Sequence, residues 1–207
     1  MTTPWTSYLP NVLPEVEACP LPLATWAIRD AVIRFCTESE IWQETQAPYT
    51  VTSTPVLIAF VVTAGSRVSR IVEAQISSRE LAVIAPETAD RLFYGWRNGV
   101  VARPEAVSQV QTDKFSVIPQ PTSSSSLILT VALQPTRDSI DGPDFLFADY
   151  YETICAKAKA TLMLMAGAKW SNPQQAAVYT MMFGKDARDA KDRNQNVFEL
   201  RGAGNAA

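Results

Sequence analysis

Hydrophobic residues recur at every third or fourth position in the last third of the chain, which predicts an amphipathic helix beginning near Asp144. Asp144 can accept the free amide groups of the first turn, and Gly167 is suited to end the helix in a left-handed conformation. The predicted inner stripe covers six turns and consists of Phe147, Tyr151, Ile154, Cys155, Ala158, Leu162 and Met165.

A second helix is predicted to start directly after a tight corner. Asn172 is a typical cap, Pro173 suits the first helical position, and Gln175 can reach back as in a capping box. The inward residues of this helix are predicted to be Ala176, Tyr179, Phe183, Ala187 and Ala190. Such a pair cannot bury enough surface to be stable alone, so we expect other parts of the chain, or another copy of it, to cover it.

A third helix is predicted from Leu23 to about Thr45, where Asp30 and Arg34 have the spacing of an ion pair one turn apart. Its inner stripe is Ala24, Ala27, Ile28, Ala31, Val32, Phe35, Cys36 and Trp42. Trp26, Ile33 and Ile41 lie outside this stripe. A helix that is apolar over more than half of its circumference is expected to be covered on two sides, by its own partner helices and by a neighbouring subunit.

Between residues 48 and 135 the hydrophobic period changes to two, which predicts strands. In the first strand Val68, Val72, Ala74 and Ile76 alternate with Ser69, Ile71, Glu73 and Gln75. In the last, Leu127, Leu129, Val131 and Leu133 alternate with Ile128, Thr130, Ala132 and Gln134. Phe115 and Val117 form a shorter run, and residues 86–93 are suited to a short helix. The apolar run 56–62 is expected to be buried on both faces or at an interface.

Both ends of the chain are predicted to be extended arms. Residues 1–22 hold five prolines, which disfavour helix interiors and strand ladders, and this arm is expected to be anchored by Trp5, Tyr8 and Leu9. Residues 197–207 are predicted to be a docking tail, whose candidate contact residues are Val197, Phe198, Leu200 and Arg201.

The predicted fold class is therefore α+β: a long-helix bundle of one N-terminal and two C-terminal helices, with an inserted antiparallel β-sheet or sandwich and extended N- and C-terminal arms. The predicted boundaries are an arm at 1–22, a helical domain at 23–47 and 143–196, an inserted β domain at 48–135, a linker at 136–142 and a tail at 197–207.

Composition narrows the possible functions. The net charge of −3 and the pI near 5.1 argue against a protein whose main task is to grip nucleic acid. No apolar segment is long enough to span a membrane, so we expect a soluble protein. The three cysteines are predicted to be buried hydrophobic residues. The chain has no histidine, which removes the commonest general base and the usual zinc ligand sets and disfavours an enzyme.

Candidate chemistry is sparse, and we assign no catalytic, cofactor-binding or metal site. Asp138, Asp141 and Asp144 do not have the spacing of a calcium loop and are better explained as a linker with capping carboxylates. One segment interleaves basic and aromatic residues, so it can be a nucleic-acid or partner loop or, as we favour, a loop packed on the sheet edge with its arginines in solvent. Its candidate residues are Arg91, Trp96, Arg97 and Arg103.

Three stretches together resemble a known family. They are Trp5-x-x-Tyr8-Leu9-Pro10-x-Val12-Leu13-Pro14-x-Val16-x-x-Cys19-Pro20, the helix segment with Ala27-Ile28-Arg29-Asp30-Ala31 and Phe35-Cys36, and Pro143-Asp144-Phe145-Leu146-Phe147 with Lys169-Trp170-Ser171-Asn172-Pro173. In this order they resemble the head-to-tail adaptor (connector or neck) proteins of short-tailed and related tailed bacteriophages, akin to tail tubular protein A.

The resemblance implies a structural virion protein of the neck or tail, made in the host cytoplasm. It implies a homo-oligomeric ring, usually of twelve copies, that completes the head–tail channel for DNA retention and ejection. The implied partners are the portal protein, the tail nozzle protein and double-stranded DNA, which passes without sequence recognition. The helices would form the ring wall, the sheet a platform, and the C-terminal extension would reach the portal. No membrane contact, cofactor or enzymatic activity is implied.

Three alternatives stay open. A DNA-binding packaging accessory would rely on the Arg/Trp segment and would bind DNA in a salt-dependent way. An enzyme, such as a carboxylate-based glycan hydrolase, would need two facing carboxylates, whereas the acidic residues of this sequence are scattered. A tail-tube or collar subunit would keep the virion setting with a different position in the particle.

Overall fold

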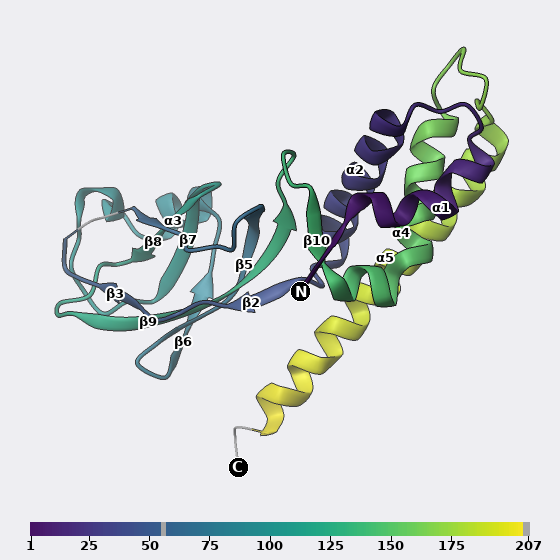
Figure 1. Ribbon diagram of the computed structural model, residues 1–207. Helices are drawn as coiled ribbons and strands as arrows, with labels where there is room; N and C mark the ends of the chain where they lie inside the picture. Colours follow the sequence, from purple (N-terminus) through teal and green to yellow (C-terminus); the bar gives the residue numbers. More distant parts are fainter. Residues whose placement is uncertain (55–56, 205–207) are drawn as a thin grey trace. The chain divides into compact units, whose positions relative to one another are not determined.

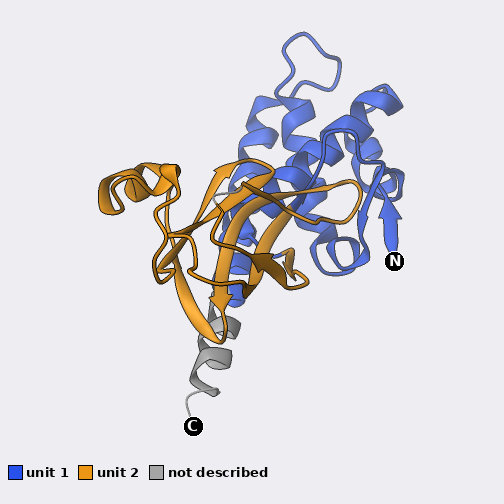
Figure 2. Cartoon of the chain, turned by 90° about the vertical axis from the view of Figure 1, so that its left-hand side faces the viewer, with its two compact units in different colours: residues 1–41, 134–207 blue, residues 42–133 orange. Residues whose placement is uncertain are grey.

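The computed structural model describes residues 1–54 and 57–204, with side chains described as far as residue 194. The chain forms two compact units, Met1–Ile41 with Gln134–Ala207 (unit 1) and Trp42–Leu133 (unit 2), coloured separately in Figure 2.

Unit 1 is built mainly from helices (Figure 1). Its elements in chain order are β1 (Thr2–Pro4), η1 (Trp5–Tyr8), α1 (Leu9–Val12), η2 (Leu13–Glu15), α2 (Leu21–Ser39), β10 (Asp141–Pro143), α4 (Asp144–Met163) and α5 (Pro173–Gly204). β1 pairs antiparallel with β10. Helices α2 and α5 both pack on α4, and the core between them contains Ile28, Phe35, Ile154 and Phe183.

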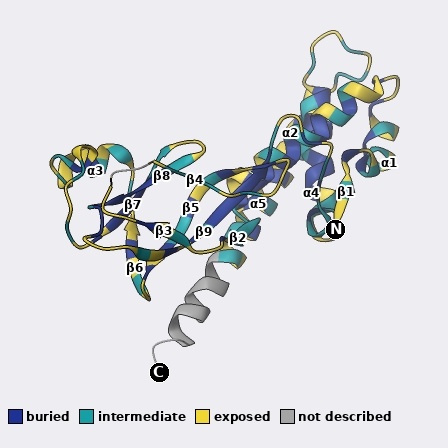
Figure 3. Ribbon diagram, turned by 60° about the vertical axis from the view of Figure 1, so that its left-hand side comes forward, coloured by how far each residue is buried: buried dark blue, intermediate teal, exposed yellow. Residues whose placement is uncertain are grey.

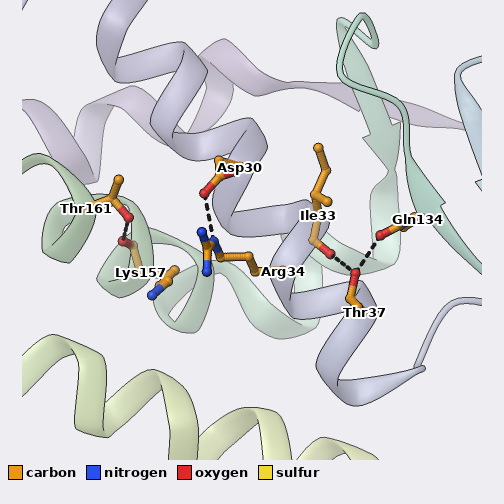
Figure 4. A network of polar contacts seen from close by, with 7 residues as sticks. All are labelled: Asp30, Ile33, Arg34, Thr37, Gln134, Lys157 and Thr161. Carbon is orange, nitrogen blue, oxygen red and sulfur yellow. Dashed lines mark hydrogen bonds and ion pairs between the residues drawn. The ribbon is translucent and has the colours of Figure 1, made fainter. Parts of the chain in front are cut away.

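Several local predictions for the helices of unit 1 are confirmed. The inner residues of α2 from Ala24 to Cys36 are fully buried, although α2 ends at Ser39 rather than near Thr45. The Arg34 Nε atom lies 2.9 Å from an Asp30 carboxylate oxygen, and Figure 4 shows this ion pair on the α2 surface. Figure 4 also shows the Thr37 hydroxyl near the Ile33 carbonyl oxygen and the Gln134 side chain.

The corner between α4 and α5 follows the prediction only in part. The Gln175 amide donates to the Asn172 side-chain oxygen at 3.2 Å, which confirms Asn172 as the cap of α5. Gly167 has a positive φ of 78° but does not end α4, because that helix stops at Met163 and its C-cap, Leu164, is right-handed. The stripe of α4 is interrupted at Tyr150, whose backbone is not helical. Helix α5 runs to Gly204, past residue 196 where the sequence predicted its end.

Unit 2 contains an eight-stranded sheet and one short helix, α3 (Pro86–Leu92). The strands are β2 (Gln43–Thr45), β3 (Tyr49–Val51), β4 (Ile58–Ala59), β5 (Ser66–Ile76), β6 (Arg79–Val83), β7 (Ala106–Gln111), β8 (Lys114–Ile118) and β9 (Ser125–Pro135). Their order is β2-β9-β5-β6-β7-β8-β4, and β3 also pairs with β9. The main core lies against β5, β8 and β9 and includes Ile71, Phe115, Leu129 and Leu133.

The predicted fold class is wrong. The described part of the chain is an open, curled, eight-stranded half-barrel sheet accompanied by helices α1–α5, and not a helix bundle with an inserted antiparallel sheet and extended arms. The sheet is mixed, because β6 and β7 are parallel and α3 lies in the connection between them. A parallel pair needs such a crossover, which the period of two does not reveal.

The N-terminal segment is also not an extended arm. Pro10, Pro14 and Pro22 occupy first-turn positions of α1, η2 and α2. Proline is compatible with the first turn of a helix because the amide hydrogen that it lacks would have no partner there. The prolines therefore start short helical turns instead of preventing them.

The alternation of β5 and the apolar run 57–62 differ from the predictions. In β5, Val68, Ala74 and Ile76 are buried as predicted. Ile71 is also buried and Val72 only half-buried, so the inward face changes before Ile71 and changes back before Ala74. Residues 55–56 lie outside the described residues. Of the rest of the run, Ile58, Phe60 and Val62 pack on the core, whereas Val61 is 72% exposed. The chain itself therefore covers only one face of this run.

Candidate functional site

Two of the predicted anchors, Trp5 and Tyr8, are part of the core of unit 1. The Trp5 side chain is 2% exposed, and its indole N–H donates to the Ser139 carbonyl oxygen at 2.8 Å. The Tyr8 ring packs against Phe147 and Tyr151, with ring centroids 5.1 and 5.5 Å apart. Leu9, the third predicted anchor, is half-buried.

A partly buried charged cluster, which the sequence did not suggest, fixes the end of the N-terminal segment. The Lys159 ammonium donates to a Glu15 carboxylate oxygen at 2.6 Å, and the Tyr179 hydroxyl donates to the other oxygen. Burial raises the pKa of Glu15, but the hydrogen bonds from Lys159 and Tyr179 and the lysine charge together bring that pKa below its usual value. Because 144 residues separate Glu15 from Lys159, no local spacing indicates the pair.

Asp141 in β10 and Asp144, the first residue of α4, have structural partners. The prediction that Asp144 caps the helix is wrong, because no described side chain makes a capping hydrogen bond at this end of α4. The Thr2 hydroxyl donates to Asp141 at 2.8 Å and the Thr3 hydroxyl to Asp144 at 2.6 Å, so both carboxylates hold strand β1. Among the described residues there is no cluster of metal-ligating side chains.

All three cysteines are buried, as predicted, and burial raises the pKa values of Cys36 and Cys155. Such thiols are unreactive.

The predicted tail contacts Val197, Phe198, Leu200 and Arg201 lie outside the residues whose side chains are described. Their backbone belongs to α5, which continues to Gly204.

The Arg/Trp segment forms a compact projection of unit 2, here called the knuckle, comprising residues 86–105. Gly95 and Gly99 have positive φ angles of 73° and 81°, which allow two sharp turns around η3 (Trp96–Asn98). The Trp96 side chain is 6% exposed and packs with Ala89, Ala106 and Ile118. Trp96 is therefore an internal anchor of the knuckle.

Asp90 connects α3 to η3 within the knuckle. Arg97 donates to both of its carboxylate oxygens, at 2.8 and 3.0 Å, and the Trp96 indole N–H donates to it at 2.8 Å. The hydrogen bonds from Arg97 and Trp96 lower the pKa of Asp90. The Arg97 guanidinium also lies 4.5 Å from the centroid of the Trp96 ring. Trp96 and Arg97 thus have partners within the chain, whereas Arg91 and Arg103 are exposed.

Unit 1 exposes apolar side chains on two different helices. Trp26 is exposed and Ile33 half-buried on the outer side of α2, which we call the α2 face. On α5, Met181 is 75% exposed and lies within one turn of the exposed Val178 and Met182; these three form the α5 face. The α5 face was not predicted, although apolar residues opposite the inner stripe of that helix are visible in the sequence.

A comparison with protein-family models found no match, and a comparison with curated proteins also found none. Among the described residues, no helix combines the length and hydrophobicity needed to cross a membrane.

Proposed function

We propose that this chain is a structural, non-enzymatic subunit that associates side by side into a ring between the portal and the tail nozzle of a tailed bacteriophage. The observation that carries the proposal is the pair of apolar faces on α2 and α5. Exposed apolar side chains that cluster on a surface are typical of protein contacts. Because the two faces belong to different helices, the α2 face of one copy would contact the α5 face of the next.

Such a head-to-tail contact is heterologous, and repeated heterologous contacts close into a ring when the rotation permits. Methionine suits a surface of this kind because its flexible thioether adapts to the shape of a partner. The net charge of −3 agrees with a wall past which DNA must move without binding. The resemblance of the sequence to head-to-tail adaptors supports the position in the particle.

The alternative of a DNA-binding packaging accessory receives less support. Its stacking platform would need Trp96 to be accessible, and that side chain is buried. Its basic surface would need a predominance of positive charge. Arg97 is paired with Asp90, and the exposed Arg91 and Arg103 are accompanied by the exposed Glu87 and Glu105.

The experiment mixes the chain with portal rings and measures mass by native mass spectrometry. We expect the wild-type chain to bind to the portal as a ring. Met181→Asp blocks the α5 face and Trp26→Glu blocks the α2 face, so neither variant should assemble alone. Mixed in equal amounts without portal, the two variants retain one intact pair of faces and should associate through it, but they should not form a ring. Ser124→Asp, which places the same charge on an exposed loop of unit 2, is the control and should assemble normally.

Circular dichroism and thermal unfolding establish that each variant is folded. A wild type that stays monomeric with the portal would refute the ring. Assembly of either single variant to the wild-type mass would refute the role of its face.

A further inference from the structure

The knuckle of unit 2 carries an apolar tip that the fold of the chain does not need. Tyr94 is 97% exposed and Leu92 63%, and the neighbouring Val100 and Val101 are also exposed. These residues flank η3 in the sequence. Figure 3 shows exposed residues along the α3 end of this unit. An almost fully exposed tyrosine beside exposed leucine and valine is costly to hydrate and has the composition of an interface centre.

The tip is held in a fixed shape before any partner arrives. Trp96 anchors it from below, and Asp90 ties α3 to η3 through three hydrogen bonds. A surface that is already ordered loses little conformational entropy when it binds, which raises its affinity for a given contact area. Tyrosine adds a large contact area with few rotatable bonds.

The charges around the tip indicate what kind of partner it fits. Glu87 and Arg91 lie one turn apart on α3, and Arg103 and Glu105 lie on the segment that leads into β7. All four are exposed, and none forms an ion pair with another described residue. The knuckle thus exposes two positive and two negative side chains on the segments that flank η3, here called the rim charges, and the charge of Glu87 also helps to raise the pKa of Arg97.

This balance favours a second copy of the same surface. A two-fold contact requires each copy to supply both members of every ion pair, because residue i of one copy meets residue j of the other and the reverse. Phosphate groups of a nucleic acid would instead be repelled by Glu87 and Glu105. A partner of one predominant charge would likewise leave one pair of rim charges unmatched.

We propose that the knuckle pairs with the knuckle of a second copy of this chain about a two-fold axis. Tyr94 and Leu92 form the centre of the contact, and Glu87 of each copy faces Arg91 of the other. The contact goes beyond the proposed function and is separable from it. An isologous contact closes at two copies, whereas the heterologous contact of the α2 and α5 faces repeats around a ring.

The test is sedimentation velocity of the full-length chain over a range of concentrations. It uses the Met181→Asp background, in which the ring contact is blocked and only the knuckle contact remains. In this background we expect a monomer–dimer equilibrium. Tyr94→Ser should weaken the dimer at least tenfold without changing thermal stability, because the side chain is 97% exposed. Ser124→Asp should leave the dimer unchanged.

Charge reversal tests the geometry of the pairing. Arg91→Glu opposes glutamate to glutamate across the axis, and Glu87→Arg opposes arginine to arginine, so each should weaken the dimer. The double variant Glu87→Arg with Arg91→Glu restores opposite charges and should recover most of the wild-type affinity. Thermal unfolding of each variant controls for changes within α3.

Three results would overturn the inference. The first is a Met181→Asp chain that remains monomeric at high concentration, and the second is a Tyr94→Ser variant that dimerises like its parent. The third is a double charge reversal as weak as the single ones. Salt-dependent binding of a 20-base-pair DNA duplex that Tyr94→Ser abolishes would assign the knuckle to nucleic acid instead. None of these results bears on the ring, which is tested by the assembly of the wild-type chain on the portal.

Discussion

Gly142→Ala tests whether the N-terminal segment is part of the core of unit 1 rather than an arm. A methyl group at position 142 would overlap one atom of the Trp5 ring. The same methyl carbon would lie 2.9 and 3.4 Å from two further atoms of that ring. Trp5 cannot move freely, because its side chain is buried and its indole N–H is bonded to Ser139. Complete expulsion of the ring would expose roughly 200 Å² of apolar surface and cost about 5 kcal/mol.

A shift of the ring by part of its width is cheaper than expulsion, since overpacking of a core typically costs about 1–3 kcal/mol. We therefore expect Gly142→Ala to lower the free energy of unfolding by about 2 kcal/mol, or Tm by roughly 4–8 °C for a chain of this length. Gly184→Ala is the matched control, because its methyl group would meet nothing within 4 Å. In the interior of α5 that substitution should stabilise the chain by about 0.5–1 kcal/mol.

Urea unfolding monitored by circular dichroism measures both effects. If the overlap is the cause, the loss of stability depends on Trp5. Phenylalanine is too short to reach position 142, so Gly142→Ala should cost much less in a Trp5→Phe background. Equal costs in the two backgrounds would show that the overlap with Trp5 is not the cause. Equal effects of Gly142→Ala and Gly184→Ala in the native background would refute the packing argument altogether.

Two further predictions concern individual polar contacts. The lowered pKa of Glu15 means that its contribution to stability is complete above the ordinary pKa of glutamate, about 4.3, and is lost as the pH falls through the lower folded value. Urea unfolding should therefore show a larger loss of stability between about pH 6 and pH 3 in the wild type than in Glu15→Gln; equal losses would contradict the role of this carboxylate. Tyr49→Phe removes the hydroxyl that accepts the Val61 amide hydrogen at 2.9 Å, so hydrogen exchange at Val61 should quicken at least several-fold. Unchanged exchange there would show that other contacts hold this segment.

The knuckle shows why a residue pattern alone does not identify a binding surface. Trp96 and Tyr94 are both aromatic and stand beside arginines in the sequence. In the structure Trp96 is an anchor within the unit and Tyr94 is exposed, so the two have opposite roles. Which of two neighbouring side chains points inward depends on the turns at Gly95 and Gly99 and on the strands beneath them.

The sequence by itself determined the features that arise within a few turns of chain. These include the inner stripe of α2, the Asp30–Arg34 pair, the Asn172 cap, and the inward face of β9, where Leu127, Leu129, Val131 and Leu133 are all buried. Such features depend on the period of side chains along a helix or strand and on local capping bonds, which a sequence displays directly.

Only the tertiary structure decided which segments meet. It brought Glu15 to Lys159, placed Trp5 against Gly142, and made β6 and β7 parallel neighbours in a mixed sheet. Each of these contacts joins segments whose proximity depends on the path of the whole chain, and no periodicity encodes that path. The prolines of the N-terminal segment were ambiguous for the same reason, because proline suits both an extended arm and the first turn of a helix until packing selects one.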